Sequence, residues 1–137
     1  MSILAIDYGR KKLGLALSRA NFLASRYSTL AKNQAVFVNL QKIRKLEKFD
    51  LIVFGLPKGL DGRKGTLEAE ARKFSQILEQ KLKIPIIFVD ESFSSEEAMR
   101  NLKMEGLNLE KSRKLVDQEA AKIILEEYLN SINFPHK

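Results

Sequence analysis

The chain has 137 residues, with 24 Lys or Arg against 17 Asp or Glu, so its formal net charge is +7. This length predicts a single domain spanning residues 1–137, large enough to bury a core without cross-links. The absence of Cys excludes disulfides, thiolate catalysis and Cys-ligated metal sites. The only His is His136, which argues against a His-based metal cage or a Ser–His–Asp triad. Carboxylates, hydroxyls, Lys, Arg and hard metal ions remain as the available chemistry.

The pattern of apolar residues predicts strands first and alternating helices and strands afterwards. Three strands are expected over residues 2–7, 13–17 and 22–30, with a turn at 9–12, and they form an antiparallel meander. The later elements are predicted as a helix over 33–48, a buried strand over 51–55, a loop over 56–65, a helix over 66–82, a buried strand over 84–89, a helix over 94–104, a polar loop over 105–114 and a helix over 115–131. This order indicates an α/β fold whose sheet has an antiparallel edge and parallel later strands.

No stretch resembles a targeting signal or approaches the ~20 apolar residues of a membrane-spanning helix, so we expect a cytoplasmic protein. The basic pI of about 9.7 favours a polyanionic partner, most simply nucleic acid. A soluble protein with a generic basic surface explains the charge equally well.

Acidic residues fall at the carboxyl ends of the predicted parallel strands, where open α/β sheets bind ligands. Asp7 ends the first strand, Asp90 and Glu91 end the last, and Asp117 lies near the start of the final helix. Converging carboxylates repel one another, and a bound Mg²⁺ removes that cost. Two such ions can support an in-line phosphoryl displacement. Neighbouring Asp90 and Glu91 point to opposite faces of a strand, so spacing leaves open which of them faces the site.

Each of these acids also has a purely structural interpretation. Asp7 can open a turn, and the pair Asp90–Glu91 can belong to a solvated loop. Asp117 can complement a helix dipole. Composition and periodicity do not decide between these structural roles and a role in metal binding or catalysis.

Four short motifs occur in order along almost the whole chain. They are Asp7-Tyr8-Gly9-Arg10-Lys11-Lys12-Leu13-Gly14-Leu15-Ala16, then Gly55-Leu56-Pro57 followed by Asp61-Gly62, then Val89-Asp90-Glu91-Ser92-Phe93-Ser94-Ser95, and finally Val116-Asp117-Gln118-Glu119-Ala120-Ala121. Together, at these spacings, they resemble the motifs of the YqgF family of pre-16S rRNA nucleases, which are also called Holliday-junction-resolvase-like proteins.

The resemblance implies an RNase H-like fold, with a mixed five-stranded sheet flanked by helices, and a nuclease that depends on Mg²⁺ or Mn²⁺. It carries catalytic and metal-binding roles onto Asp7, Glu91 and Asp117, and it thereby selects Glu91 over Asp90. In such folds the acid of the first strand usually touches both metal ions and each of the other two acids holds one.

The chain departs from the family pattern at several positions. The family usually has Arg directly after the acid of the third motif, where this chain has Ser92, so a guanidinium that could hold a phosphate is missing. Arg19 and Ala20 replace a frequent Asp-Pro, and Arg26 stands where a Pro is common. Related resolvases carry a further Asp at the position of Ala120, which is usually absent in this family.

Basic residues near the acidic edge are the candidates for nucleic-acid contacts. They are Arg10, Lys11 and Lys12 in the first turn, Arg63 and Lys64 in the loop before the second helix, and Arg113 and Lys114 before the last helix. A plain flexible loop explains Arg63 and Lys64 equally well, and this loop lacks the Gly-Lys-Ser/Thr ending of a Walker-type NTPase. A further basic cluster within residues 42–48 is interpreted as a solvated helix face.

The resemblance implies hydrolysis of structured nucleic acid, most simply of a ribosomal RNA precursor at the 5′ end of its 16S part. One alternative is a non-catalytic RNA-binding factor for ribosome assembly with the same fold. Another is a Holliday-junction-type DNA resolvase, which would need a dimer to cut two strands symmetrically, and no sequence feature establishes one. An actin-like phosphotransferase is disfavoured because it needs two lobes.

Overall fold

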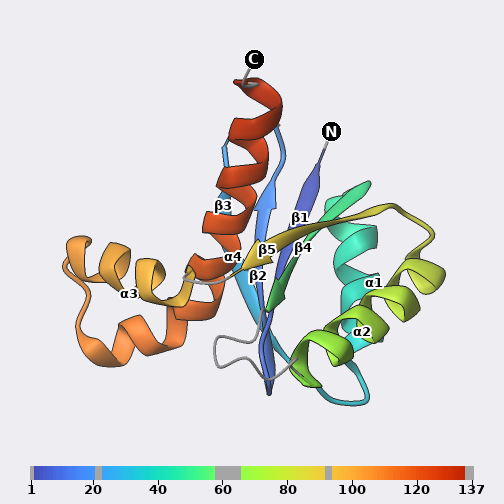
Figure 1. Cartoon of the computed structure of the whole chain (residues 1–137), viewed down its shortest axis with the longest axis horizontal. Helices are drawn as coiled ribbons and strands as arrows, with labels where there is room; N and C mark the ends of the chain where they lie inside the picture. The colour runs from blue at the N-terminus through green and yellow to red at the C-terminus, as the bar shows by residue number, and fades with distance from the viewer. Residues whose placement is uncertain (1, 21–22, 58–65, 92–93, 135–137) are drawn as a thin grey trace.

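Five strands form one mixed sheet with helices on both of its faces in the computed structural model (Figure 1), which describes residues 2–20, 23–57, 66–91 and 94–134. The elements are β1 (Ile3–Tyr8), β2 (Lys12–Ser18), β3 (Ser25–Ala31), α1 (Val36–Glu47), β4 (Leu51–Pro57), α2 (Thr66–Leu82), β5 (Ile86–Glu91), α3 (Ser94–Met104) and α4 (Leu109–Asn133). The strand order is β3-β2-β1-β4-β5.

The sheet is antiparallel on one side of β1 and parallel on the other. β1 pairs with β2, and β2 with β3, in antiparallel fashion, and only a few residues separate consecutive strands, as antiparallel pairing allows. β4 pairs in parallel with β1 and β5, and the crossovers into β4 and β5 contain α1 and α2. The predicted fold class, a mixed five-stranded sheet with antiparallel first strands and parallel later strands, is confirmed.

Two hydrophobic layers hold the helices to the sheet. On one face, α1 and α2 cover alternate residues of the strands, including Leu4, Ile6 and Phe54. On the other face, α4 covers the intervening residues, including Ala5 and Val53, while α3 packs against α4 rather than against the sheet (Figure 1). This two-residue alternation of the strands is what separates the two layers.

From residue 14 to residue 18, the α4 face of β2 presents only small residues. Gly14, Ala16 and Ser18 alternate with the larger Leu13, Leu15 and Leu17, which face α1 and α2. At Gly14 the approach leaves no room for a side chain, because an added Cβ would collide with the backbone carbonyl of Asp117 in α4. Small residues on β2 therefore let α4 lie directly on the strand.

Three sequence predictions were wrong in detail. Residues 109–114 were predicted as loop but are helical, because Asn108 caps α4 by accepting a hydrogen bond from the Lys111 amide at 2.9 Å. Leu56 and Pro57 were predicted as loop but extend β4, while 58–65 lie outside the described residues. β5 was predicted as a buried strand, yet Phe88 is 41% exposed because β5 is an edge strand.

Within the described ranges, no helix combines the length and the apolar composition needed to cross a membrane. The longest helix, α4, carries charged side chains along its length.

Candidate functional site

Asp7 and Asp117 both border Gly14 on the α4 face of the sheet. Asp7 is the direct antiparallel partner of Gly14 in the pairing of β1 with β2. Asp117 lies over Gly14 from α4, and a Cβ built on the glycine would stand 2.9 Å from the Asp117 Cβ. Two acids that are 110 positions apart in the sequence are thereby brought to the same place in the fold.

Asp117 is half-buried in this contact. Burial raises the pKa of its carboxyl above the ordinary value, and the positive charge of Lys12 opposes that rise. Asp117 lies about two turns inside α4, so the dipole of the helix N-terminus, which acts within the first turn, does not explain its position.

Position 91 falls on the same face of the sheet as Asp7. Val89 packs in the α4 layer, and strand alternation places position 91 on that face and Asp90 on the opposite one. In the pairing of β4 with β5, Glu91 is opposite Pro57, two residues beyond the row that holds Gly55 and Asp7. The side chain of Glu91 itself lies outside the part of the chain that the structure describes.

The two described carboxylates suit a hard divalent cation. A half-buried carboxylate whose pKa is raised by burial gains from a nearby positive charge, and oxygen donors are the ligands that Mg²⁺ prefers. The described side chains, which do not include that of Glu91, contain no group of three Asp, Glu, His or Cys able to hold a metal ion. Mg²⁺ is commonly held by one or two carboxylates together with waters, so Asp7 and Asp117 are sufficient as candidate ligands.

In the described part of the chain, basic residues lie near the edge of the sheet at which Asp7 and Asp117 lie. Arg10, Lys11 and Lys12 are exposed in and after the turn between β1 and β2, which Gly9 closes by donating to the Lys12 carbonyl at 3.0 Å. The positive charge of Lys12 acts on Asp117 and lowers the pKa of its carboxyl, against the effect of burial.

Of the four other basic residues predicted to contact nucleic acid, the structure describes the two on α4. Arg113 is exposed on α4, one helical turn before Asp117. Lys114 is exposed and pairs with Glu110 at 3.9 Å. Arg63 and Lys64 lie outside the described residues.

Lys32 is a further basic residue at this edge that sequence reasoning missed. Its Nζ donates to the Gly9 carbonyl at 2.8 Å and lies 4.0 Å from the centre of the Tyr8 ring. Its backbone amide donates to the Lys11 carbonyl at 2.9 Å. Lys32 therefore fixes the turn that follows Asp7. The available signal was a lysine directly after the third strand, opposite the Arg10–Lys12 turn in a meander.

The two arginines that depart from the family pattern are engaged in ion pairs. Arg19 donates to Glu47 on α1 at 2.8 and 3.1 Å. Arg26 on β3 is paired with Glu105 and Glu119, and its hydrogen bonds hold the pKa of the Glu105 carboxyl below the ordinary value. Their charges are used within the protein.

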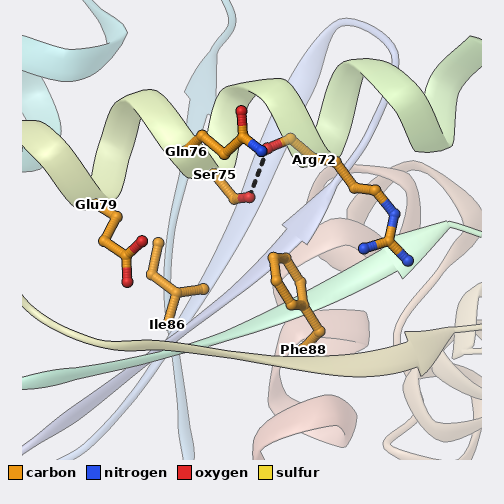
Figure 2. Close-up of a pocket in the computed structure, with 6 residues that line it drawn as sticks. All are labelled: Arg72, Ser75, Gln76, Glu79, Ile86 and Phe88. Carbon is orange, nitrogen blue, oxygen red and sulfur yellow. Dashed lines mark hydrogen bonds between the residues drawn. The ribbon is translucent and has the colours of Figure 1, made fainter.

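A cavity of about 270 Å³ lies on the other side of the sheet, between α2 and β5 (Figure 2). Figure 2 shows Phe88 and Ile86 of β5 facing the helix, with Arg72 above Phe88 at 5.7 Å from the ring centre. None of the predicted site residues lines this cavity. It is therefore separate from the acidic edge.

Comparison with solved structures defines the class of this fold. The RuvC resolvase of T. thermophilus in complex with a Holliday junction superposes with a TM-score of 0.62 over 98% of this chain and 96% of that one, at 12% identity. The Fowlpox virus resolvase in complex with Holliday junction DNA gives 0.62 over 96% and 99%, at 14% identity. The chain thus has the RNase H-like fold of these resolvases.

Sequence comparison then identifies the family. A family model described as "RuvX: Holliday junction resolvase" matches residues 1–131, and the chain belongs to this family. A protein of Maridesulfovibrio salexigens named "Putative pre-16S rRNA nuclease" is 40% identical over 94% of this chain and 98% of its own length. A Bacillus subtilis protein of the same name is 32% identical over 97% and 100%. The family is one of nucleases, that is, of hydrolases acting on phosphodiester bonds.

Proposed function

We propose that this protein is a metal-dependent nuclease that processes ribosomal RNA precursor, at the 5′ end of the 16S part, in the cytoplasm. The observation that carries the proposal is the contact of Asp117 with Gly14, the strand partner of Asp7. The names of the relatives from Maridesulfovibrio salexigens and Bacillus subtilis support the choice of RNA substrate.

In this proposal Asp7, Glu91 and Asp117 are the catalytic acids and hold Mg²⁺ or Mn²⁺. The choice of Glu91 over Asp90 is supported by the β5 register, which puts position 91 on the face of Asp7. A divalent ion bound by these acids supplies Lewis-acid stabilisation for the negative charge that develops on the phosphate during hydrolysis. The raised pKa of Asp117 supports such a role, because a nearby cation would favour its charged form.

The basic residues around the acids would position the nucleic-acid backbone. Lys12 and Arg113 flank Asp117 from two different elements, β2 and α4. Arg10, Lys11 and Lys114 extend the positive charge away from the acids, and Arg63 and Lys64 are assigned the same role from their place in the sequence. Such contacts fix the register of the substrate without reading its bases.

Cleavage of two labelled substrates tests the proposal: a ribosomal RNA precursor fragment and a DNA four-way junction. Each is incubated with Mg²⁺, with Mn²⁺ or with chelator, using the wild-type protein and the Asp7→Asn variant. We expect metal-dependent cutting of the RNA that is lost in Asp7→Asn, while binding of the RNA is kept or strengthened because a negative charge is removed. Asp90→Asn is the matched control and should cut like wild type.

The other outcomes separate the alternatives. Preferential cutting of the junction would assign the activity to DNA resolution, in keeping with the Holliday junctions bound in the two solved resolvase structures that share the fold. Tight RNA binding without cutting under any condition would indicate a ribosome-assembly factor. Equal cutting by Asp7→Asn and wild type would reject the three-acid site.

A further inference from the structure

Arg26 joins three elements through two carboxylates. Its guanidinium is bidentate on Glu105, with N–O distances of 2.8 and 3.2 Å, and Nη1 also donates to Glu119 Oε1 at 3.0 Å. Arg26 comes from β3, Glu105 follows the end of α3, and Glu119 belongs to α4. The network therefore ties the two C-terminal helices to the sheet.

Glu119 is the buried member of this network. Its side chain is only 3% exposed, and its second oxygen, Oε2, accepts a hydrogen bond from Asn101 Nδ2 of α3 at 3.1 Å. Both carboxylate oxygens therefore have a named donor, each from a different element. These donors hold the side chain in one orientation relative to β3 and α3.

The network is adjacent in sequence to the contact at Gly14. Asp117, Gln118 and Glu119 are consecutive on α4, and each touches a different partner. Asp117 lies on Gly14 of β2, Gln118 Nε2 donates to Thr29 Oγ1 of β3 at 3.1 Å, and Glu119 binds Arg26. Successive helix residues are separated by about 100° around the axis, so these contacts act from different sides and define the rotation of α4.

Stability alone is a weak reason for such a pair. A buried ion pair repays its desolvation only when the geometry is excellent, and apolar residues of similar volume often replace it without loss. A pair with fixed donors does, however, specify an orientation that apolar packing leaves freer. The position of Arg26, opposite Ala16 beside a register shift in the pairing of β2 with β3, directs its side chain toward α4.

We propose that Arg26 is a positioning residue, which through Glu119 fixes the rotation of α4 and so holds Asp117 over Gly14. The proposal rests on the proposed nuclease function for its effect on cleavage, but the placement of Asp117 itself is independent of that function. Arg26 is engaged by two carboxylates and does not need to contact the substrate. Displacements of about 1 Å at a catalytic group can cost on the order of a hundredfold in rate.

The informative variant is the double substitution Arg26→Met/Glu119→Leu, since Arg26→Met alone leaves a buried carboxylate without its cation. The melting temperature identifies whether the variant is folded. We expect kcat to fall about ten- to a hundredfold, with KM for the nucleic acid within about twofold of wild type. In the metal-free protein, the nuclear Overhauser effect between the Gly14 Hα and Asp117 Hβ protons should weaken. Arg19→Met, which removes the pair with Glu47 on the other face, is the matched control and should change neither quantity.

Each outcome decides the proposal. A folded double variant that keeps the wild-type kcat and an unchanged nuclear Overhauser effect between Gly14 and Asp117 would overturn the proposal. A raised KM with a smaller salt dependence of binding, at unchanged kcat, would overturn it as well, by making Arg26 a phosphate contact. If the wild-type protein cuts no substrate, the proposed function fails. The nuclear Overhauser effect between Gly14 and Asp117 in the double variant still decides whether Arg26 positions Asp117.

Discussion

Gly14 and Asp117 are in direct contact across β2 and α4, and no side chain larger than hydrogen fits between them. The backbone conformation of Gly14 lies in an ordinary strand, so the glycine is required here by the approach of the helix and not by its torsion angles. The same contact brings the carboxylates of a strand and a helix to one edge of the sheet. The glycine is therefore part of the candidate site although it carries no functional group.

Gly14→Ala should displace α4 and reduce both stability and cleavage. The added methyl collides with backbone atoms of Asp117, which cannot rotate away, and overpacking of this kind costs about 1–3 kcal/mol. Chemical denaturation measures the stability, and cleavage of the ribosomal RNA precursor fragment measures the activity. Full activity in this variant would show that the position of Asp117 is not needed.

Gly106→Ala is the control for a loss of stability without displacement of the site. Gly106 has a φ of +85° after α3, and its amide donates to the Lys103 carbonyl at 2.9 Å. Nothing lies near an added Cβ, so only the backbone conformation is disfavoured, by about 1–2 kcal/mol. This variant should lose stability comparably to Gly14→Ala but retain its cleavage rate under conditions where it is folded.

Asp117→Asn should abolish cleavage and stabilise the metal-free protein at neutral pH. Burial raises the pKa of Asp117 in the folded state above its unfolded value, so the charged carboxylate opposes folding once the pH is above the folded pKa. The stability advantage of the variant should therefore be present at pH 7 and disappear as the pH falls below the ordinary aspartate range, near 4. Melting temperatures between pH 3.5 and 8 in chelator measure this, and a constant difference at every pH would contradict it.

Lys12→Ala and Arg113→Ala should each weaken nucleic-acid binding without regard to sequence. If each residue contacts one phosphate, the slope of log K against log salt should decrease by about 1 per variant. Fluorescence anisotropy from 50 to 300 mM salt measures the slope. Lys45→Ala on α1, on the opposite face of the sheet, is the matched control, and a change of slope there would place the interface elsewhere.

Asn108→Ala should destabilise the protein by about 1 kcal/mol, because the Lys111 amide at the start of α4 loses its acceptor. Asn108→Asp keeps an acceptor at this position and should retain wild-type stability. Denaturant unfolding of both variants measures the difference. If Ala and Asp are equally stable, the side-chain cap contributes nothing to α4.

The sheet was largely predictable from the sequence because its strands are short apolar runs bounded by turn residues. β1 and β2 follow from the apolar runs on either side of the turn at residues 9–12, and α1 follows from helical spacing. The start of α4 was missed because residues 109–114 are mostly polar and show no apolar stripe. The Asn108 cap was nevertheless present as a signal. The exposure of β5 depends on strand order, which local patterns do not contain.

The candidate site was only partly predictable for the same reason. Strand ends could be recognised locally, so Asp7 and the Asp90–Glu91 pair were located from apolar runs. The face on which position 91 lies required the register between β4 and β5. The contact of Gly14 with Asp117 depends on how closely α4 approaches the sheet; the small residues at alternate positions of β2 permit a close approach, but they do not identify α4 as the partner.

The position of α4 as the last element in chain order has a consequence for synthesis on the ribosome. Protein chains emerge and fold from the N-terminus, so the sheet with Asp7 can assemble before α4 has left the ribosome. Until α4 docks on Gly14, the nascent chain lacks one of its three proposed acids. The order of the elements therefore makes completion of the proposed three-acid site a later step than assembly of the sheet that carries Asp7.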